Sequence, residues 1–119
     1  LHCSPTDELR RGDVFEHLRT LRAEGRIRRF GVSVESMEEA AICLEQDGLT
    51  SLQIIFNCFR QKPIDTLFSP AKARGVALIV RLPLASGLLS GRMRPDTVFA
   101  EDDHRRFNRD GAAFNVGET

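Results

Sequence analysis

The stretch GVALIVRLPLASGLLSGR, residues 75–92, decides how the rest of the chain is interpreted. It begins with an apolar run of strand length that is rich in β-branched residues, Val76–Val80, and continues into a loop with Pro83, two serines and two glycines. This pattern is typical of a buried parallel strand that delivers a loop to a working surface. Because a buried strand requires neighbours on both sides, the remaining residues are expected to supply them.

The composition predicts one small globular domain and gives no support for a nucleic-acid or membrane partner. The 17 basic and 17 acidic side chains cancel, so the electrostatic argument for binding nucleic acid or an anionic membrane is missing. The sequence has no apolar run long enough to span a bilayer. The odd set of three cysteines has no metal-ligand spacing, which favours a reducing compartment. We therefore expect a cytoplasmic location and no metal site.

Strand and helix patterns alternate along the sequence, and glycines end the helical patterns. Ser36 and Glu39 have the spacing of a capping box, which predicts the start of one helix. Pro70 lies inside another helical pattern, where we expect a kink or a new helix start capped by Ser69. The predicted elements are a strand end at 1–3, a turn-rich stretch at 4–7, a helix around 14–21, a strand at 27–34, a helix around 37–44, a strand at 52–57, a helix around 64–71, a strand at 76–80, and a long loop at 93–119 with a short helix near 101–108.

This alternation predicts parallel strands joined by right-handed crossovers, in an α/β fold. The pattern alone does not choose between a barrel and an open sheet. Three strands and a strand end leave two open sheet edges, which an independent domain has to cover. Because an eight-unit barrel needs about 250 residues, the 119 residues favour part of a larger barrel.

Four segments carry a more specific signal when they are taken in order: LHCSP at 1–5, EGRIR at 24–28 with FGVS at 30–33, LQIIFN at 52–57, and PLASGLLSG at 83–91. Together they resemble the aldo-keto reductases, in which such segments lie at the ends of the fourth to seventh strands of a (β/α)8 TIM barrel. The resemblance covers residues 1–119 and implies that they are one partial aldo-keto reductase domain, with 93–119 a loop within it.

The resemblance implies NADPH-dependent reduction of aldehydes and ketones to alcohols. In the family a Tyr gives a proton to the carbonyl oxygen, helped by Lys, Asp and His, because a phenol of pKa about 10 must be made a stronger acid. His2 matches the histidine, which donates to the carbonyl oxygen and orients it. The sequence has no Tyr, and the family's Asp and Lys belong to earlier segments. We therefore expect the chain by itself to be inactive.

Three residues match positions that contact the nicotinamide in the family. Ser33 and Gln53 match residues that hydrogen-bond the carboxamide, although Val34 stands where the family often has Asn. Arg81 stands where many members stack an aromatic ring on the nicotinamide, and a subgroup carries Arg there. A planar guanidinium can stack as well, but its charge disfavours the oxidised cofactor or demands a nearby acid.

The loop after residue 81 matches the segment that holds the cofactor pyrophosphate through backbone donors. Its residues at this position are Leu84, Ser86, Gly87 and Leu88. The family's site for the adenosine 2′-phosphate lies beyond Thr119, so the preference for NADPH is implied by the family alone.

Other interpretations of the same residues stay open. Without the family, a lone His after a strand is most often a hydrogen-bonded structural residue, and Arg81 can pair with a carboxylate instead of stacking. Two other interpretations of the chain are a half-barrel that binds nucleotide without catalysis and an interaction module that self-associates through its open sheet edges. The alternative to both is part of an enzyme that acts on a small carbonyl substrate. A measurement of NADPH binding tests the half-barrel, and light scattering tests the self-associating module.

Overall fold

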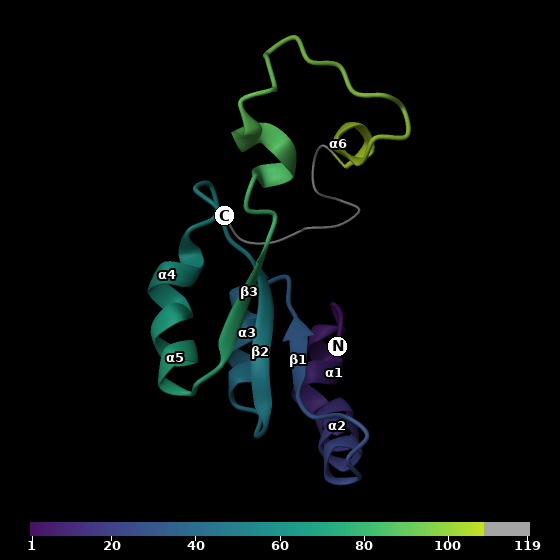
Figure 1. Cartoon of the computed structure of the whole chain (residues 1–119), viewed down its shortest axis with the longest axis vertical. Helices are drawn as coiled ribbons and strands as arrows, with labels where there is room; N and C mark the ends of the chain where they lie inside the picture. The colour runs from purple at the N-terminus through teal and green to yellow at the C-terminus, as the bar shows by residue number, and fades with distance from the viewer. Residues whose placement is uncertain (109–119) are drawn as a thin grey trace.

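The computed structural model describes residues 1–108 and shows strands alternating with helices (Figure 1). After the last strand the chain enters a short 3₁₀ helix and then a long connection to one more helical turn. The elements are α1 (Thr6–Arg11), α2 (Asp13–Ala23), β1 (Phe30–Ser33), α3 (Met37–Leu44), β2 (Leu49–Ile55), α4 (Lys62–Thr66), α5 (Phe68–Ala73), β3 (Ala77–Arg81), η1 (Ala85–Ser90) and α6 (His104–Phe107).

The three strands form one parallel sheet in the order β1-β2-β3. The first residues of the chain extend it, because His2 pairs in parallel with Ser33 at the outer side of β1. The Cys3 amide donates to the Ser33 carbonyl at 3.0 Å, and the Ser33 amide donates to the Leu1 carbonyl at 3.0 Å. The predicted strand end at 1–3 is therefore present, and neighbouring strands follow chain order.

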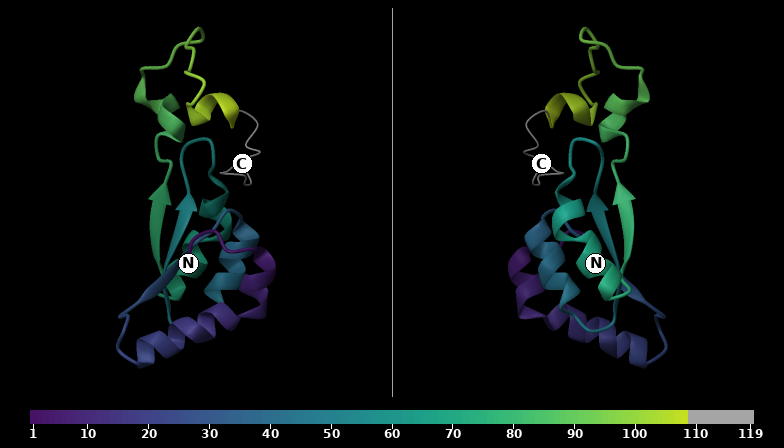
Figure 2. Two further views of the ribbon diagram at one scale, coloured as in Figure 1. Left: turned by 90° about the vertical axis from the view of Figure 1, so that its right-hand side faces the viewer. Right: turned by 90° about the vertical axis from the view of Figure 1, so that its left-hand side faces the viewer.

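The helices cover one face of the sheet and leave the other open (Figure 2). Side chains alternate between the two faces along each strand. Val32 and Ile54 are fully buried against the helices, whereas their neighbours Ser33 and Gln53 belong to the open face. The helical layer contributes the largest buried side chains of the core, among them Leu9, Phe15 and Leu67.

The strand of the 75–92 stretch is less buried than its sequence predicts. β3 pairs with β2 on one side only among the described residues, from Ser51↔Ala77 to Ile55↔Arg81. Ile79 is 50% exposed and Val80 is 41% exposed. β3 is therefore one of the two open sheet edges expected from the sequence, and its inner face has no covering layer among residues 1–108.

Residues 4–7, predicted to be turn-rich, instead lead directly into α1. Pro5 occupies the N-cap position, and acidic Asp7 and Glu8 lie in the first turn where the helix dipole favours negative charge. The helix buries Leu9 completely, which supplies a packing energy that the short sequence pattern did not reveal. Gly12, in the left-handed conformation, separates α1 from α2.

Two strands and one helix differ from prediction at their ends. β1 begins at Phe30 and not at residue 27, because the amides of Arg26 and Ile27 donate back to the Leu21 carbonyl and close the helix end. β2 spans 49–55 in place of 52–57. The break expected near Pro70 is present, but the N-cap position of α5 is Leu67 and not Ser69, so Pro70 falls in the first turn where a missing amide is tolerated.

The segment after β3 forms a separate lobe beyond the carboxyl ends of the strands (Figure 1). It contains η1 and α6, and the latter confirms the short helix predicted near 101–108. The remainder of the predicted loop, from residue 109 to 119, lies outside the described residues.

Candidate functional site

Three of the predicted site residues lie side by side at one level of the sheet. His2 pairs with Ser33, Ser33 pairs with Gln53, and Gln53 pairs with Ile79 of β3. Because paired residues of adjacent parallel strands project to the same face, this row crosses four neighbouring segments of chain. The predicted residues come from positions 2, 33 and 53, so the fold brings together groups that are far apart in sequence.

The row lines an open hollow of about 260 Å³ on the helix-free face of the sheet. The polar groups at its wall are an imidazole, two hydroxyls and an amide, and Leu1 and Ile79 are among its apolar lining residues. Ligand sites combine an apolar surface with a few placed polar groups in this way. Its lining residues are Leu1, His2, Gly31, Val32, Ser33, Ser51, Gln53 and Ile79.

Backbone pairing fixes these side chains in position. Ser33 is only 5% exposed, and its backbone bonds to Leu1 and Cys3 on one side of β1. On the other side the Val34 amide donates to the Gln53 carbonyl at 3.0 Å. Gly31 approaches β2 so closely that a Cβ built on it would lie 2.1 Å from the Ser51 hydroxyl oxygen and 2.6 Å from the Ser51 carbonyl oxygen. Only glycine allows this approach of the strands.

Arg81, Glu35 and Cys3 form a polar cluster at the carboxyl ends of the strands. The Arg81 guanidinium donates to Oε1 of Glu35, and the Cys3 thiol donates to the same oxygen at 3.3 Å. The Cys3 sulfur also lies 3.7 Å from the Ser33 hydroxyl. Burial raises the pKa of the Cys3 thiol, and the Glu35 carboxylate adds to that rise. The cluster therefore holds a neutral thiol between the hollow and an ion pair.

The sequence left two interpretations of Arg81, stacking on the nicotinamide and pairing with a carboxylate. In this structure Arg81 pairs with the Glu35 carboxylate. Its side chain is 20% exposed and that of Glu35 is 26% exposed, so the pair is partly shielded from water. Sequence reasoning did not identify Glu35. The signal was present, since Glu35 follows Ser33 by two residues, the spacing that returns an extended chain to the same face.

The residues predicted to hold a pyrophosphate lie in η1 and just before it, away from the row. Leu84 and Leu88 are more than half exposed, and Ser86 and Gly87 both have positive φ. The Gly87 amide donates to the Leu84 carbonyl at 3.0 Å, as does the Leu89 amide at 3.1 Å. Of the amides expected to face an anion, that of Gly87 is therefore already paired inside the turn.

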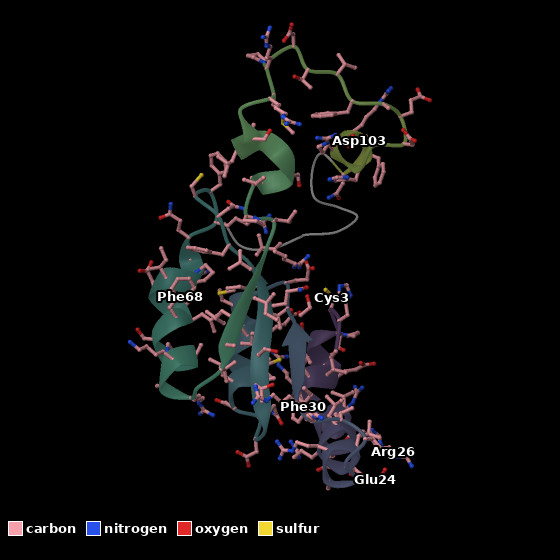
Figure 3. All side chains as sticks on the ribbon, in the orientation of Figure 1. Cys3, Glu24, Arg26, Phe30, Phe68 and Asp103 are labelled. Atoms are coloured by element: carbon pink, nitrogen blue, oxygen red, sulfur yellow. The ribbon has the colours of Figure 1, made fainter. Side chains whose placement is uncertain are left out.

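Leu84 and Gly87 line a second, wider hollow of about 780 Å³ between η1 and α6. The Arg105 guanidinium lies 4.3 Å from the centre of the Phe99 ring and is hydrogen-bonded to the Asp103 carboxylate. Those bonds hold the pKa of Asp103 well below its usual range. Figure 3 shows Asp103 beside α6, whereas Cys3 lies near the tip of β1, so the two charged clusters belong to different parts of the molecule.

Within residues 1–108, no group of three or more His, Cys, Asp or Glu side chains is placed to hold a metal ion. A search of the same residues finds no helix that is long and apolar enough to cross a membrane.

An open parallel sheet with helices on one face and polar side chains along its carboxyl ends is the arrangement of part of a (β/α)8 barrel. The chain belongs to the aldo/keto reductase family, whose family model matches residues 1–118. No curated protein sequence matches it. Among solved structures, the chain is similar to the glycerol dehydrogenase AKR11B4 from Gluconobacter oxydans, with 31% sequence identity and a TM-score of 0.66.

That match covers 87% of this chain and 32% of the glycerol dehydrogenase. The chain therefore spans about a third of the length of this neighbour. The similarity confirms the predicted fold class, an α/β partial TIM barrel with parallel strands alternating with helices.

The residues of the row fit the amide end of a nicotinamide. A carboxamide presents one carbonyl acceptor and one NH₂ donor, and a serine hydroxyl and a glutamine amide can each both donate and accept. Ser33 and Gln53 are paired neighbours on the same face, and Ile79 beside them offers an apolar surface to a flat ring.

Proposed function

We propose that the full-length protein containing this sequence is an NADPH-dependent aldo-keto reductase that reduces aldehydes or ketones to alcohols. In this proposal residues 1–119 form a partial domain that supplies much of the cofactor side of the barrel. The observation that carries it is the row formed by His2, Ser33 and Gln53, which line one hollow on the inner face of the sheet. Family membership over residues 1–118 supports the same reaction class.

His2 is the proposed catalytic residue of this part of the site. It stands at the carboxyl end of its strand segment, on the face where barrel enzymes build their sites. Its imidazole donates a hydrogen bond to the substrate carbonyl oxygen, which orients the carbonyl and stabilises the negative charge that develops there. The reduced cofactor, when bound, supplies the hydride.

Ser33 and Gln53 bind the carboxamide of the nicotinamide in this proposal. Their backbones are fixed by strand pairing on both sides, so their side chains are presented without a large loss of conformational freedom on binding. Leu84, Ser86, Gly87 and Leu88 form the turn that faces the pyrophosphate. Because the Gly87 amide is already paired, this contact requires the turn to rearrange or to use its other amides.

The chain by itself is proposed to be inactive. It contains no Tyr, so it lacks the group that protonates the carbonyl oxygen in the family. The three free cysteines are consistent with the proposed cytoplasmic location, a reducing compartment. For the full-length protein, a small carbonyl compound is the proposed substrate, and glycerol is the first alcohol to test in the reverse direction because of the similarity to a glycerol dehydrogenase.

The test is the effect of His2→Ala on turnover and on cofactor binding in the full-length protein. We expect kcat for carbonyl-dependent NADPH oxidation to fall by about 100-fold or more, with the dissociation constant for NADPH changed less than threefold. His17→Ala is the matched control, since His17 is an exposed residue of α2. Equal losses of turnover and of cofactor binding in His2→Ala would show that His2 is structural.

A further inference from the structure

We propose that Glu35 is a positioning residue that, by neutralising Arg81, allows the site to bind the oxidised cofactor as well as the reduced one. This inference rests on the proposed function and on the position of Arg81 beside the nicotinamide, which the family resemblance implies. It adds to that function a residue that neither the sequence pattern nor the hollow itself identified.

The geometry shows that both side chains belong to the face that carries the site. Arg81 follows Ile79 by two residues in β3, and Ile79 lines the hollow. Glu35 follows Ser33 by two residues, and the Cys3 thiol reaches both of them. The ion pair thus bridges the ends of β1 and β3 across β2.

The ion pair between Arg81 and Glu35 affects cofactor binding because the charge of the nicotinamide ring differs between the two cofactor forms. The nicotinamide ring is cationic in NADP⁺ and neutral in NADPH, so a bare guanidinium beside it repels only the oxidised form. A carboxylate bonded to that guanidinium removes most of the repulsion. Because both partners are only 20% and 26% exposed, water screens their charges less than it does at an open surface.

The other polar groups near Glu35 do not supply the negative charge that its loss would remove. Arg60, which lines a small hollow together with Glu35, Met37, Ile55 and Pro63, is a cation. The Cys3 thiol, which donates to the same Glu35 oxygen, is neutral and does not replace the lost charge.

The test measures dissociation constants for NADP⁺ and NADPH separately, by calorimetry and by cofactor fluorescence, in the full-length protein. For Glu35→Gln we expect the ratio of the NADP⁺ constant to the NADPH constant to rise about tenfold. For Arg81→Gln we expect the ratio to fall, because the Glu35 carboxylate is then no longer neutralised by the guanidinium beside the nicotinamide. The double variant removes both charges and is expected to return the ratio to within about threefold of wild type.

Two matched controls separate charge from shape. Glu35→Asp keeps the charge and is expected to leave the ratio within about threefold of wild type. Glu38→Gln removes a carboxylate that instead pairs with Arg10 of α1, and it is expected to leave the ratio unchanged.

The outcomes are distinguishable. Equal weakening of both cofactors by Glu35→Gln, or an unchanged ratio, would overturn the role of Glu35 while leaving the proposed function intact. Failure of the unmodified protein to bind either cofactor at millimolar concentration would overturn the proposed function itself. If Glu35→Gln does not fold, Arg81→Gln tests the same charge balance with the opposite sign, and an unchanged ratio there contradicts the inference.

Discussion

At the scale of single residues, Cys43 shows how burial controls ionisation in this fold. Its side chain is completely buried in α3, and this burial raises the pKa of the thiol to about 12. The nearby Glu39 carboxylate contributes to this rise in the pKa. Cys43 is therefore a packed apolar group at neutral pH and not a nucleophile.

Burial of Cys43 predicts a loss of stability at high pH. Below about pH 9 the thiol is protonated in both the folded and the unfolded chain, so it adds no pH dependence. Between about pH 9 and pH 12 the unfolded chain releases the proton and the folded chain keeps it, so the free energy of unfolding falls by at most about 1.4 kcal/mol per pH unit. Urea denaturation at pH 8, 9 and 10 measures this slope.

The comparison that isolates Cys43 is with Cys43→Ala, which is expected to lose the additional slope. Cys58→Ala is the control, because Cys58 is exposed. Identical pH slopes for Cys43→Ala and the unmodified protein would contradict the assignment.

The role of a residue was predictable where the family resemblance identified it, and not where it depends on a contact between distant segments. His2, Ser33 and Gln53 were found through the family resemblance, and the pairing of strands then placed them at one level. Glu35 was not found: its spacing from Ser33 indicates only the face on which it lies, whereas its role depends on a contact with Arg81, 46 residues away. Likewise, the close approach of Gly31 to Ser51 arises from pairing between strands and is not visible in either segment alone.

At the scale of elements, the start of α3 joins the site to the helical layer. The predicted capping box is confirmed, with the Glu39 amide donating to the Ser36 hydroxyl at 3.2 Å. The Glu39 carboxylate does more than cap, since it accepts from the Glu35 amide at 2.8 Å and from the Thr6 hydroxyl of α1 at 2.9 Å. It therefore fixes the backbone of the residue that pairs with Arg81.

Glu39→Ala is expected to destabilise the protein more than Ser36→Ala. Loss of the Ser36 cap costs about 1 kcal/mol, whereas Glu39→Ala removes acceptors for three groups and should cost about 2 kcal/mol. Denaturant titration of both variants measures the difference. Equal destabilisation would mean that Glu39 acts only as a helix cap.

Helices and strands were predictable where the hydrophobic periodicity of the sequence or a helix-capping motif was clear. The alternation of strands and helices and the capping box of α3 followed from sequence. The helix α1 did not, because six residues after a proline carry too short a period and the helix is stabilised by burial of Leu9. The ends of β1 and β2 shifted because pairing in the sheet, and not propensity, sets where a strand begins.

At the scale of the whole molecule, the sheet has a covered face and an open one. The helices bury the core on one side, and the proposed site occupies the other (Figure 2). The apolar run of β3 predicts burial, but burial on the open face requires a layer that residues 1–108 do not provide. Self-association through this edge, expected from the sequence, stays a prediction.

The central claim is that the row on the open face binds a nicotinamide, and Gln53→Ala tests it most directly. In the full-length protein this variant should weaken NADPH binding about tenfold, because it removes hydrogen bonds to the carboxamide, while the denaturation midpoint stays within about 2 °C of wild type. Gln46→Ala, in the turn between α3 and β2, is the control and should bind normally. An unchanged dissociation constant for NADPH in a folded Gln53→Ala protein would contradict the claim.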